Sequence, residues 1–249
     1  MDFQIISIFP DLFPAFFGNG IIRRAAEKQL IRAHVLDLRS YTADRHRTTD
    51  DRPYGGGCGM VMIPGPVTDA IRDAKKRAPG SPVIYLSPQG KPFSQEMAAA
   101  LSLMDGMILV CGRYEGLDER VIESEIDLEL SVGDYVLTGG EIPAMTVMDA
   151  VTRLLPGALG GPESAVADSF SGSLLEHAHY TRPASFEGRE VPGVLLSGNH
   201  GFIAQWRRRM SLLRTALKRP DLLRGRELTP EERRGLEDLK TELEELLAG

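Results

Sequence analysis

The chain has 249 residues, of which 42% are hydrophobic, and it carries a formal net charge of −6. This length fits one large or two modest domains with an apolar core, and the acidic total excludes a general binder of polyanions. Two cysteines are too few for a disulfide framework or a zinc site, and we see neither a signal peptide nor a run able to cross a bilayer. We therefore expect a cytoplasmic protein with no membrane partner.

Short apolar runs alternate with amphipathic stretches over the first 155 residues, a pattern typical of an α/β protein with a parallel sheet. Strands are predicted at 3–9, 34–38, 82–86, 107–111 and 127–132. Helices are predicted at 21–30, 64–77, 93–103, 117–125 and 141–155, the last with proline in its first turn.

A polar, glycine-dense loop at 45–60 contains the pattern Gly55-x-Gly57-x-Gly59. A dinucleotide-binding fingerprint needs an apolar strand immediately before it and a helix immediately after it. Here charged residues precede the glycines and two prolines follow closely. We therefore interpret the segment as an exposed, flexible loop.

Two further loops follow predicted strands and carry both glycine and tyrosine. The run 107–111 leads into GRYEG at 112–116, and the run 126–132 leads into GDYVLTGG at 133–140. Loops that follow neighbouring parallel strands lie at the same edge of the sheet, where open α/β sheets bind ligands. Their exposed backbone groups could read the edge of a purine, and the end of the 82–86 strand could join them.

The motifs VCGRYEGLDER and VGDYVLTGGEIPA closely resemble those of the bacterial tRNA (guanine-N1)-methyltransferases. The similarity continues in the same order from IISIFPDLF near the start to SGNHGFIAQWR near the end. The resemblance implies a SPOUT enzyme that uses S-adenosylmethionine (SAM): an α/β fold whose parallel sheet carries a C-terminal trefoil knot, followed by a small, mostly helical C-terminal domain. The pattern alone predicts no knot, because threaded chains are rare.

The expected domains are a SAM-binding knotted domain at 1–160, a flexible linker at 161–174 and a helical tRNA-binding domain at 175–249. The resemblance implies catalytic roles for Asp168 as base, Arg153 as electrophilic partner and Glu115 as a helper beside the methyl donor. It implies SAM contacts at Tyr85, Leu86, Pro88, Gly112, Tyr114, Glu115, Val132, Gly133, Tyr135, Leu137, Gly139, Gly140 and Pro143. Without the resemblance, Asp168 reads as a solvated linker residue and Arg153 as a cation that favours a helix C-terminus.

These roles agree with the chemistry of guanine. N1 carries a proton and is a poor nucleophile at neutral pH, so a carboxylate within hydrogen-bond reach is needed to remove that proton. A guanidinium aimed at O6 stabilises the negative charge that develops there. The resemblance further implies a homodimer, a tRNA substrate methylated at the guanosine 3′ to the anticodon, and use of Mg²⁺, for which we see no dedicated ligand set.

Residues 182–219 contain eight Lys/Arg and two Asp/Glu, a local excess that could meet phosphates. The candidate tRNA contacts are Arg182, Arg207, Arg208, Arg209 and Arg214. Helical spacing divides 207–209 over different faces, so a solvated helix stays an alternative. His177 and His179 would point to opposite sides of a strand, and without a third ligand we expect no metal there.

Two other functions remain open on the sequence alone. One is a knotted SAM-dependent methyltransferase that acts on another RNA nucleotide, for example on a ribose 2′-oxygen, which would need no base at guanine N1. The other is a catalytically silent RNA-binding protein with a vestigial cofactor pocket.

Overall fold

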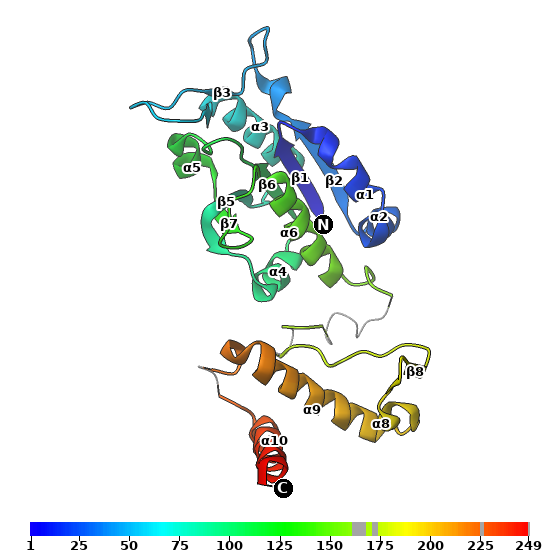
Figure 1. The fold of residues 1–249 in the computed structure, drawn as a ribbon. Coiled ribbons are helices and arrows are strands. Elements are labelled where there is room, and N and C mark those ends of the chain that lie inside the picture. Colours follow the sequence, from blue (N-terminus) through cyan, green and yellow to red (C-terminus); the bar gives the residue numbers. More distant parts are fainter. Residues whose placement is uncertain (161–167, 171–173, 225–226, 249) are drawn as a thin grey trace. The chain divides into compact units, whose positions relative to one another are not determined.

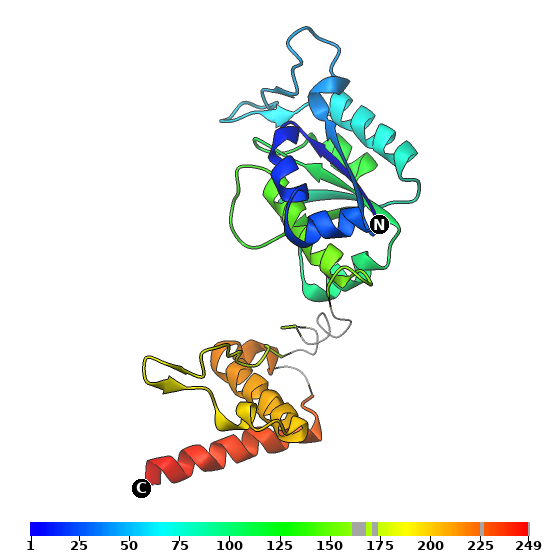
Figure 2. The same ribbon diagram turned by 90° about the vertical axis from the view of Figure 1, so that its right-hand side faces the viewer.

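The computed structural model describes residues 1–160, 168–170, 174–224 and 227–248. The chain divides into two compact units, Met1–Pro162 and Glu163–Gly249, and Figures 1 and 2 show the elements of each. Most of the predicted linker at 161–174 lies outside the described residues. Of the helices in the described ranges, none combines the length and apolar character needed to span a membrane.

The first unit is built on a five-stranded parallel sheet whose strand order is β2-β1-β6-β5-β7. Its strands are β1 (Asp2–Ser7), β2 (Arg32–Asp37), β5 (Val83–Pro92), β6 (Gly106–Cys111) and β7 (Leu128–Ser131). The parallel α/β fold predicted from the sequence is therefore confirmed. The first strand ends earlier than predicted, and Phe9, assigned to it, lies beyond it and is 43% exposed.

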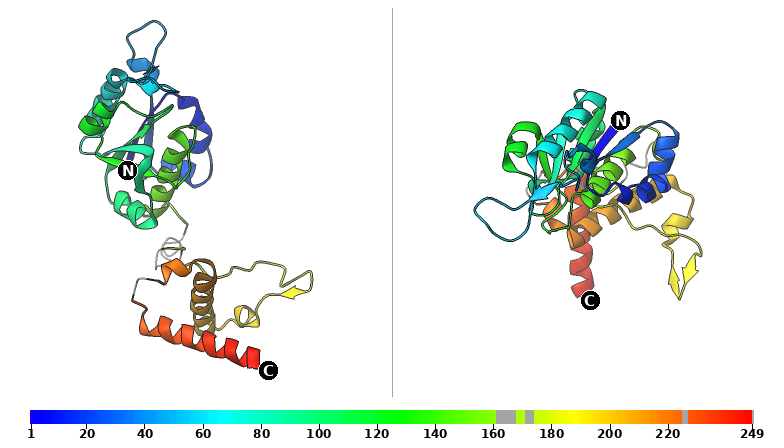
Figure 3. Two further views of the ribbon diagram at one scale, coloured as in Figure 1. Left: turned by 60° about the vertical axis from the view of Figure 1, so that its left-hand side comes forward. Right: turned by 90° about the horizontal axis from the view of Figure 1, so that it is seen from above.

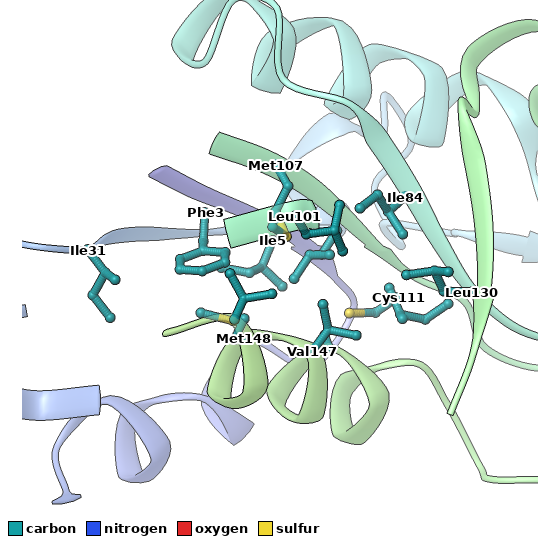
Figure 4. Packing of buried hydrophobic residues seen from close by; sticks show 14 of the residues in the cluster. Phe3, Ile5, Ile31, Ile84, Leu101, Met107, Cys111, Leu130, Val147 and Met148 are labelled. Carbon is teal, nitrogen blue, oxygen red and sulfur yellow. The ribbon is translucent and has the colours of Figure 1, made fainter. Parts of the chain in front are cut away.

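Helices cover both faces of the sheet (Figures 1 and 3). One face carries α1 (Pro14–Phe17), α2 (Gly20–Glu27), α4 (Gln95–Ser102) and α6 (Glu141–Leu154), and the other carries α3 (Pro64–Arg77) and α5 (Glu119–Glu125). Alternation along β1 sends Phe3 and Ile5 into the first core and Ile6 into the second. Val147 and Met148 of α6 pack on the first core (Figure 4).

The strand β5 is interrupted where it pairs with β7. Leu86 and Lys91 both face Leu130, so residues 87–90 leave the ladder as a bulge. Gly90 fits there because a Cβ would lie 2.6 Å from the carbonyl carbon of Leu130. Since β5 lies between β6 and β7, the carboxyl ends of these three strands are neighbours at one edge of the sheet.

Four shorter elements complete the first unit: η1 (Pro10–Leu12), η2 (Leu38–Tyr41) and the antiparallel pair β3 (Asp50–Asp51) and β4 (Val61–Met62). The glycine-rich segment between β3 and β4 is exposed, as predicted, and Tyr54 at its start is fully exposed.

The second unit is mostly helical. It contains the hairpin β8 (Ser185–Phe186) and β9 (Arg189–Glu190), followed by α8 (Gly193–Leu196), α9 (His200–Lys218), η3 (Pro220–Leu222) and α10 (Pro230–Ala248). Asn199 caps α9, because its side-chain oxygen accepts hydrogen bonds from the N–H groups of Gly201 and Phe202 at 3.1 and 3.2 Å.

Candidate functional site

A cavity of about 310 Å³ lies where the carboxyl ends of β5, β6 and β7 meet. Its walls come from residues 85–89, 112–117 and 129–140, with contributions from α5 and α6. All thirteen residues to which the sequence analysis assigned SAM contacts are among those that line it. The structure thus brings these residues together in a volume typical of small-molecule sites.

Five glycines line this cavity, and each is close to other atoms of the chain. A Cβ on Gly112 would lie 2.6 Å from the ring of Tyr85, and one on Gly140 would lie 2.7 Å from the Cα of Cys111. Gly116, in turn, has φ of +120°, a conformation that favours glycine. The loops after β6 and β7 therefore lie against each other and against β5 more closely than side chains would allow.

A buried carboxylate anchors the start of α6. Glu141 is fully buried. Its Oε2 accepts a hydrogen bond from Nε of Arg113 at 2.9 Å and lies 2.8 Å from Nη2 of the same guanidinium in an ion pair. The hydroxyl of Ser7, at the end of β1, donates to Oε1 at 2.7 Å. A buried charge is tolerated when it is paired and hydrogen-bonded in this way.

The same guanidinium reaches the second loop of the cavity. Nη1 of Arg113 donates to the carbonyl of Thr138 at 3.1 Å, and the group lies 4.6 Å from the ring centroid of Phe9. Gly139 packs against it, because a Cβ there would overlap the guanidinium. Arg113 therefore connects the loop after β6 with the loop after β7.

The roles of Glu141 and Arg113 were not predicted from the sequence. Ile142, the apolar residue next to Glu141, is 58% exposed, whereas Glu141 is buried with Ala144 and Met148. The signal was helical spacing, since Glu141 stands three residues before Ala144 and seven before Met148. An acidic residue on the apolar face of a helix indicates that its carboxylate has a buried polar or charged partner.

Two titratable groups next to these loops, the Cys111 thiol and the Tyr85 phenol, are neutral at neutral pH. Burial raises the pKa of the Cys111 thiol well above its ordinary value, and the nearby Glu141 carboxylate raises it further. Burial also raises the pKa of the Tyr85 phenol. Because a thiolate is the nucleophilic form of cysteine, Cys111 is not suited to covalent catalysis.

The glycine-rich segment before β4 adjoins the cavity. The N–H of Glu115 donates to the carbonyl of Met60 at 2.9 Å, and a Cβ on Gly59 would overlap the Glu115 side chain. Burial, together with the charge of Asp50 and a hydrogen bond to it, raises the pKa of the Tyr114 phenol. The loop at 45–60 is thus joined to Tyr114 and Glu115, two of the residues assigned to the site.

Two of the assigned catalytic residues belong to different units. Arg153 is half-buried in the last turn of α6, in the first unit. Asp168 is half-buried in the second unit, between two undescribed stretches of the chain. Their catalytic roles stay predictions.

The structure separates the five arginines assigned to tRNA. Arg182 and Arg207 line one cavity, whereas Arg208 and Arg209 line another that also contains acidic residues, and Arg208 forms an ion pair with Glu231 at 2.6 Å. Arg214 is half-buried. Among the described residues, Arg182 and Arg207 therefore share a site whose lining includes no carboxylate.

His177 and His179 lie side by side rather than on opposite sides of a strand. Their ring centroids are 4.4 Å apart, in a segment without regular secondary structure. Glu176 adds a third potential metal ligand, which the sequence analysis did not consider, and one ligand atom from each residue lies within 4.8 Å of the others. In the structure Oε1 of Glu176 lies 2.8 Å from Nε2 of His179.

Replacing Glu141 with glutamine removes the counter-charge of Arg113 while keeping the size of the side chain. We expect E141Q to lower the free energy of unfolding by about 3–5 kcal/mol, the usual cost of breaking a buried ion pair from one side. We also expect SAM binding to weaken, because Arg113 no longer holds the loop at 133–140. Thermal unfolding and calorimetric titration with SAM measure the two effects.

The matched control is E123Q on α5, which changes an exposed glutamate and should shift stability by less than about 0.5 kcal/mol. SAM affinity equal to that of the unaltered chain in a folded E141Q protein would contradict the role given to this ion pair.

Comparisons with known proteins show which family the chain belongs to. The family model described as tRNA (Guanine-1)-methyltransferase TrmD matches residues 1–225. A protein of Desulfatibacillum aliphaticivorans named tRNA (guanine-N(1)-)-methyltransferase is 55% identical over 232 residues, covering 93% of this chain and 88% of its own. Proteins of the same name from Syntrophotalea carbinolica and from Bacillus cereus strain B4264 are 52% and 49% identical, covering 96% and 97% of this chain and 97% and 100% of their own. The chain therefore belongs to the tRNA (guanine-1)-methyltransferase family.

Proposed function

We propose that this protein transfers a methyl group from SAM to N1 of the guanosine 3′ to the anticodon in tRNA. One observation carries the proposal: in a chain of this family, the thirteen residues assigned to the methyl donor line a single cavity at the carboxyl edge of a parallel sheet. The relatives named tRNA (guanine-N(1)-)-methyltransferase, at 49–55% identity, support the reaction.

The lining of the cavity fits a cofactor that carries both an adenosine and positive charge. Apolar side chains of Val132 and Leu137 suit the faces of a purine, and backbone groups of the glycine-rich loops can meet its edge. Glu119 and Glu129 add carboxylates to the lining, while the nearby charge of Arg113 is balanced by Glu141. When bound, SAM supplies an electrophilic methyl group, so the protein supplies position and proton transfer.

The proton chemistry is assigned to two side chains. The carboxylate of Asp168 accepts the N1 proton of guanine as the bond between N1 and the methyl carbon forms and the bond from sulfur to that carbon breaks. The guanidinium of Arg153 donates to O6, where negative charge develops. Glu115, on the cavity wall, helps to position the reacting groups.

We also propose the finer features that the resemblance implies: a trefoil knot, a homodimer, a cytoplasmic location and use of Mg²⁺. The N–H of Gly140 donates to the carbonyl of Gly112 at 2.9 Å, and Arg113 and Gly139 form an antiparallel bridge, so the chain after β7 returns past the loop after β6. This crossing supports a threaded path. Val136, 85% exposed, and Ile142 offer apolar surface beside the cavity that supports association of subunits.

A methylation assay tests the reaction and the base together. Labelled SAM is incubated with tRNA transcripts that differ only in the nucleotide after the anticodon, and the product nucleoside is identified by mass spectrometry. We expect 1-methylguanosine from the guanosine transcript alone. Replacing Asp168 with asparagine should lower kcat by about 10²–10⁴, the usual contribution of a general base, while SAM affinity is retained.

The two alternatives give different results in this assay. A ribose methyltransferase would yield a 2′-O-methylated nucleoside and would keep its rate in D168N. A silent RNA-binding protein would bind the transcript and form no methylated product.

Mixed subunits test the homodimer. In the resembled family the site lies between the knotted domain of one subunit and the C-terminal domain of the other, so Gly140 and Asp168 variants should complement each other. G140V places a side chain against Cys111 in the first unit, and D168N removes the base in the second. We expect an inactive G140V and an inactive D168N protein to regain roughly a quarter of full activity after subunit exchange, because random pairing makes half of the dimers mixed and each has one intact site.

If activity does not rise after mixing, in proteins shown by sedimentation to exchange subunits, both residues belong to the site of the same subunit.

The salt dependence of tRNA binding tests the arginine assignment. Neutralising Arg182 and Arg207 together should weaken binding and lower the slope of log Kd against log salt by about 1.4–1.8, since each phosphate contact contributes about 0.7–0.9. Filter binding at several salt concentrations measures the slope. The control K218A removes one charge from α9, the helix of Arg207, outside the cavity that Arg182 and Arg207 line, and should change the slope less. Equal slopes for the unaltered protein, the double variant and K218A would contradict the assignment.

A further inference from the structure

The second unit contains a cavity of about 550 Å³ that the reaction chemistry above does not use. Its walls come from residues 177–184, from Val191, and from α8 and α9, all within this unit. Val191, Leu195 and Ile203 give it an apolar floor. The cavity is thus large enough for a nucleotide and is built without the first unit.

Aromatic rings form one side of this cavity. The ring centroids of Tyr180 and Trp206 are 6.2 Å apart with planes inclined at 57°, and His177 meets Trp206 edge-on at 6.4 Å. Tyr180 is half-exposed. The planes of Tyr180 and Trp206 are inclined rather than stacked, so these two rings do not cover each other face to face. Faces of this kind are where proteins stack single-stranded bases.

The charge on the lining is positive. Arg182 and Arg207 are both exposed and both line the cavity, and no aspartate or glutamate is among the described residues that line it. Arg207 and Trp206 both line the cavity, so a cation and the largest ring face the same space. Aromatic faces combined with arginines are the usual means of holding an unpaired nucleotide by its base and its phosphates.

We propose that this cavity binds an unstacked base of the tRNA, with the base against Trp206 and Tyr180 and the flanking phosphates at Arg182 and Arg207. The proposal rests on the proposed function, since it assumes that tRNA is the substrate. The base held here is not the one that is methylated, because the described residues of this lining include no carboxylate to take a proton from guanine N1. The second unit therefore recognises a further nucleotide, and this fixes the register of the anticodon loop.

The competing occupant of this region is a metal ion held by Glu176, His177 and His179. The observations favour the base, because His179 and Glu176 already satisfy each other at 2.8 Å, whereas the ring faces and the two arginines point to a planar, anionic ligand. The experiment below distinguishes a bound metal from a bound base.

Trp206 is the single tryptophan of the chain, so its fluorescence reports on this cavity alone. The full-length protein is titrated with a tRNA transcript that it methylates, and then with transcripts that each carry one abasic nucleotide in the anticodon loop. We expect intact tRNA to quench the fluorescence, and one abasic transcript, with the target guanosine still present, to lose the quench and to bind more weakly.

Variants give an independent readout. W206A should raise the Kd for tRNA roughly five- to a hundredfold, the range produced by the loss of one base–aromatic stack, with SAM affinity unchanged. W206F, which keeps a ring face, should recover most of that affinity. The matched control is F202A, which removes an exposed ring of the same helix outside the cavity and should leave tRNA binding unchanged.

The outcomes separate the two proposals. If the unaltered protein methylates tRNA without any change in fluorescence, or if W206A binds tRNA as tightly as F202A does, the base-binding site is overturned while the proposed function stands. If Zn²⁺ alone at micromolar concentration quenches the fluorescence, E176Q abolishes that quench and tRNA causes none, the region is a metal site instead. If no methylated product forms at all, the proposed function fails, and quenching by tRNA still decides the base-binding site.

Discussion

The candidate SAM cavity depends on one buried charge. Glu141 is held between Arg113 and Ser7. The three residues come from separate parts of the chain: Glu141 from the first turn of α6, Arg113 from the loop after β6 and Ser7 from the end of β1. Removing a carboxylate from water is unfavourable by several kcal/mol unless its oxygens are satisfied, and here the hydrogen bonds do so. The three side chains must therefore be in place together, and through Arg113 they set the position of Thr138 and Gly139 in the loop after β7.

This constraint explains why backbone forms so much of the cavity. The guanidinium of Arg113 leaves no room for a side chain at Gly139, and Tyr85 and the backbone of Cys111 leave none at Gly112 and Gly140. Peptide N–H and C=O groups are thereby brought to the surface in fixed directions. Loops of this kind recognise the edge of a base by hydrogen bonds and require no rearrangement to do so.

The sheet and the cavity could be predicted from the sequence because the signals are local. Parallel strands buried on both faces read as short apolar runs, and strands that end in glycine mark the ligand edge, so the 107–111 run and its GRYEG loop were correctly placed. The interruption of β5 was not predictable, since it depends on the pairing of Leu86 and Lys91 with one residue of β7. Pairs such as Arg113 and Glu141, 28 residues apart, likewise leave no periodic signal.

The second unit was predictable only in part. The long helix and its Asn199 cap follow from local sequence, but the segment that carries His177, His179 and Tyr180 has no regular structure, and its side chains are placed by contacts with α9. Periodicity says nothing about such a segment. The same limitation explains why Glu176 was not connected with the two histidines.

The crowded glycines also bear on drug resistance. Each of the five glycines on the cavity wall would bring a new Cβ within 3.0 Å of another atom of the protein, whatever ligand is present. An inhibitor that makes its hydrogen bonds to the peptide groups of these loops would therefore be opposed by few viable substitutions, because a change that blocks the compound also distorts the wall on which the natural ligand depends.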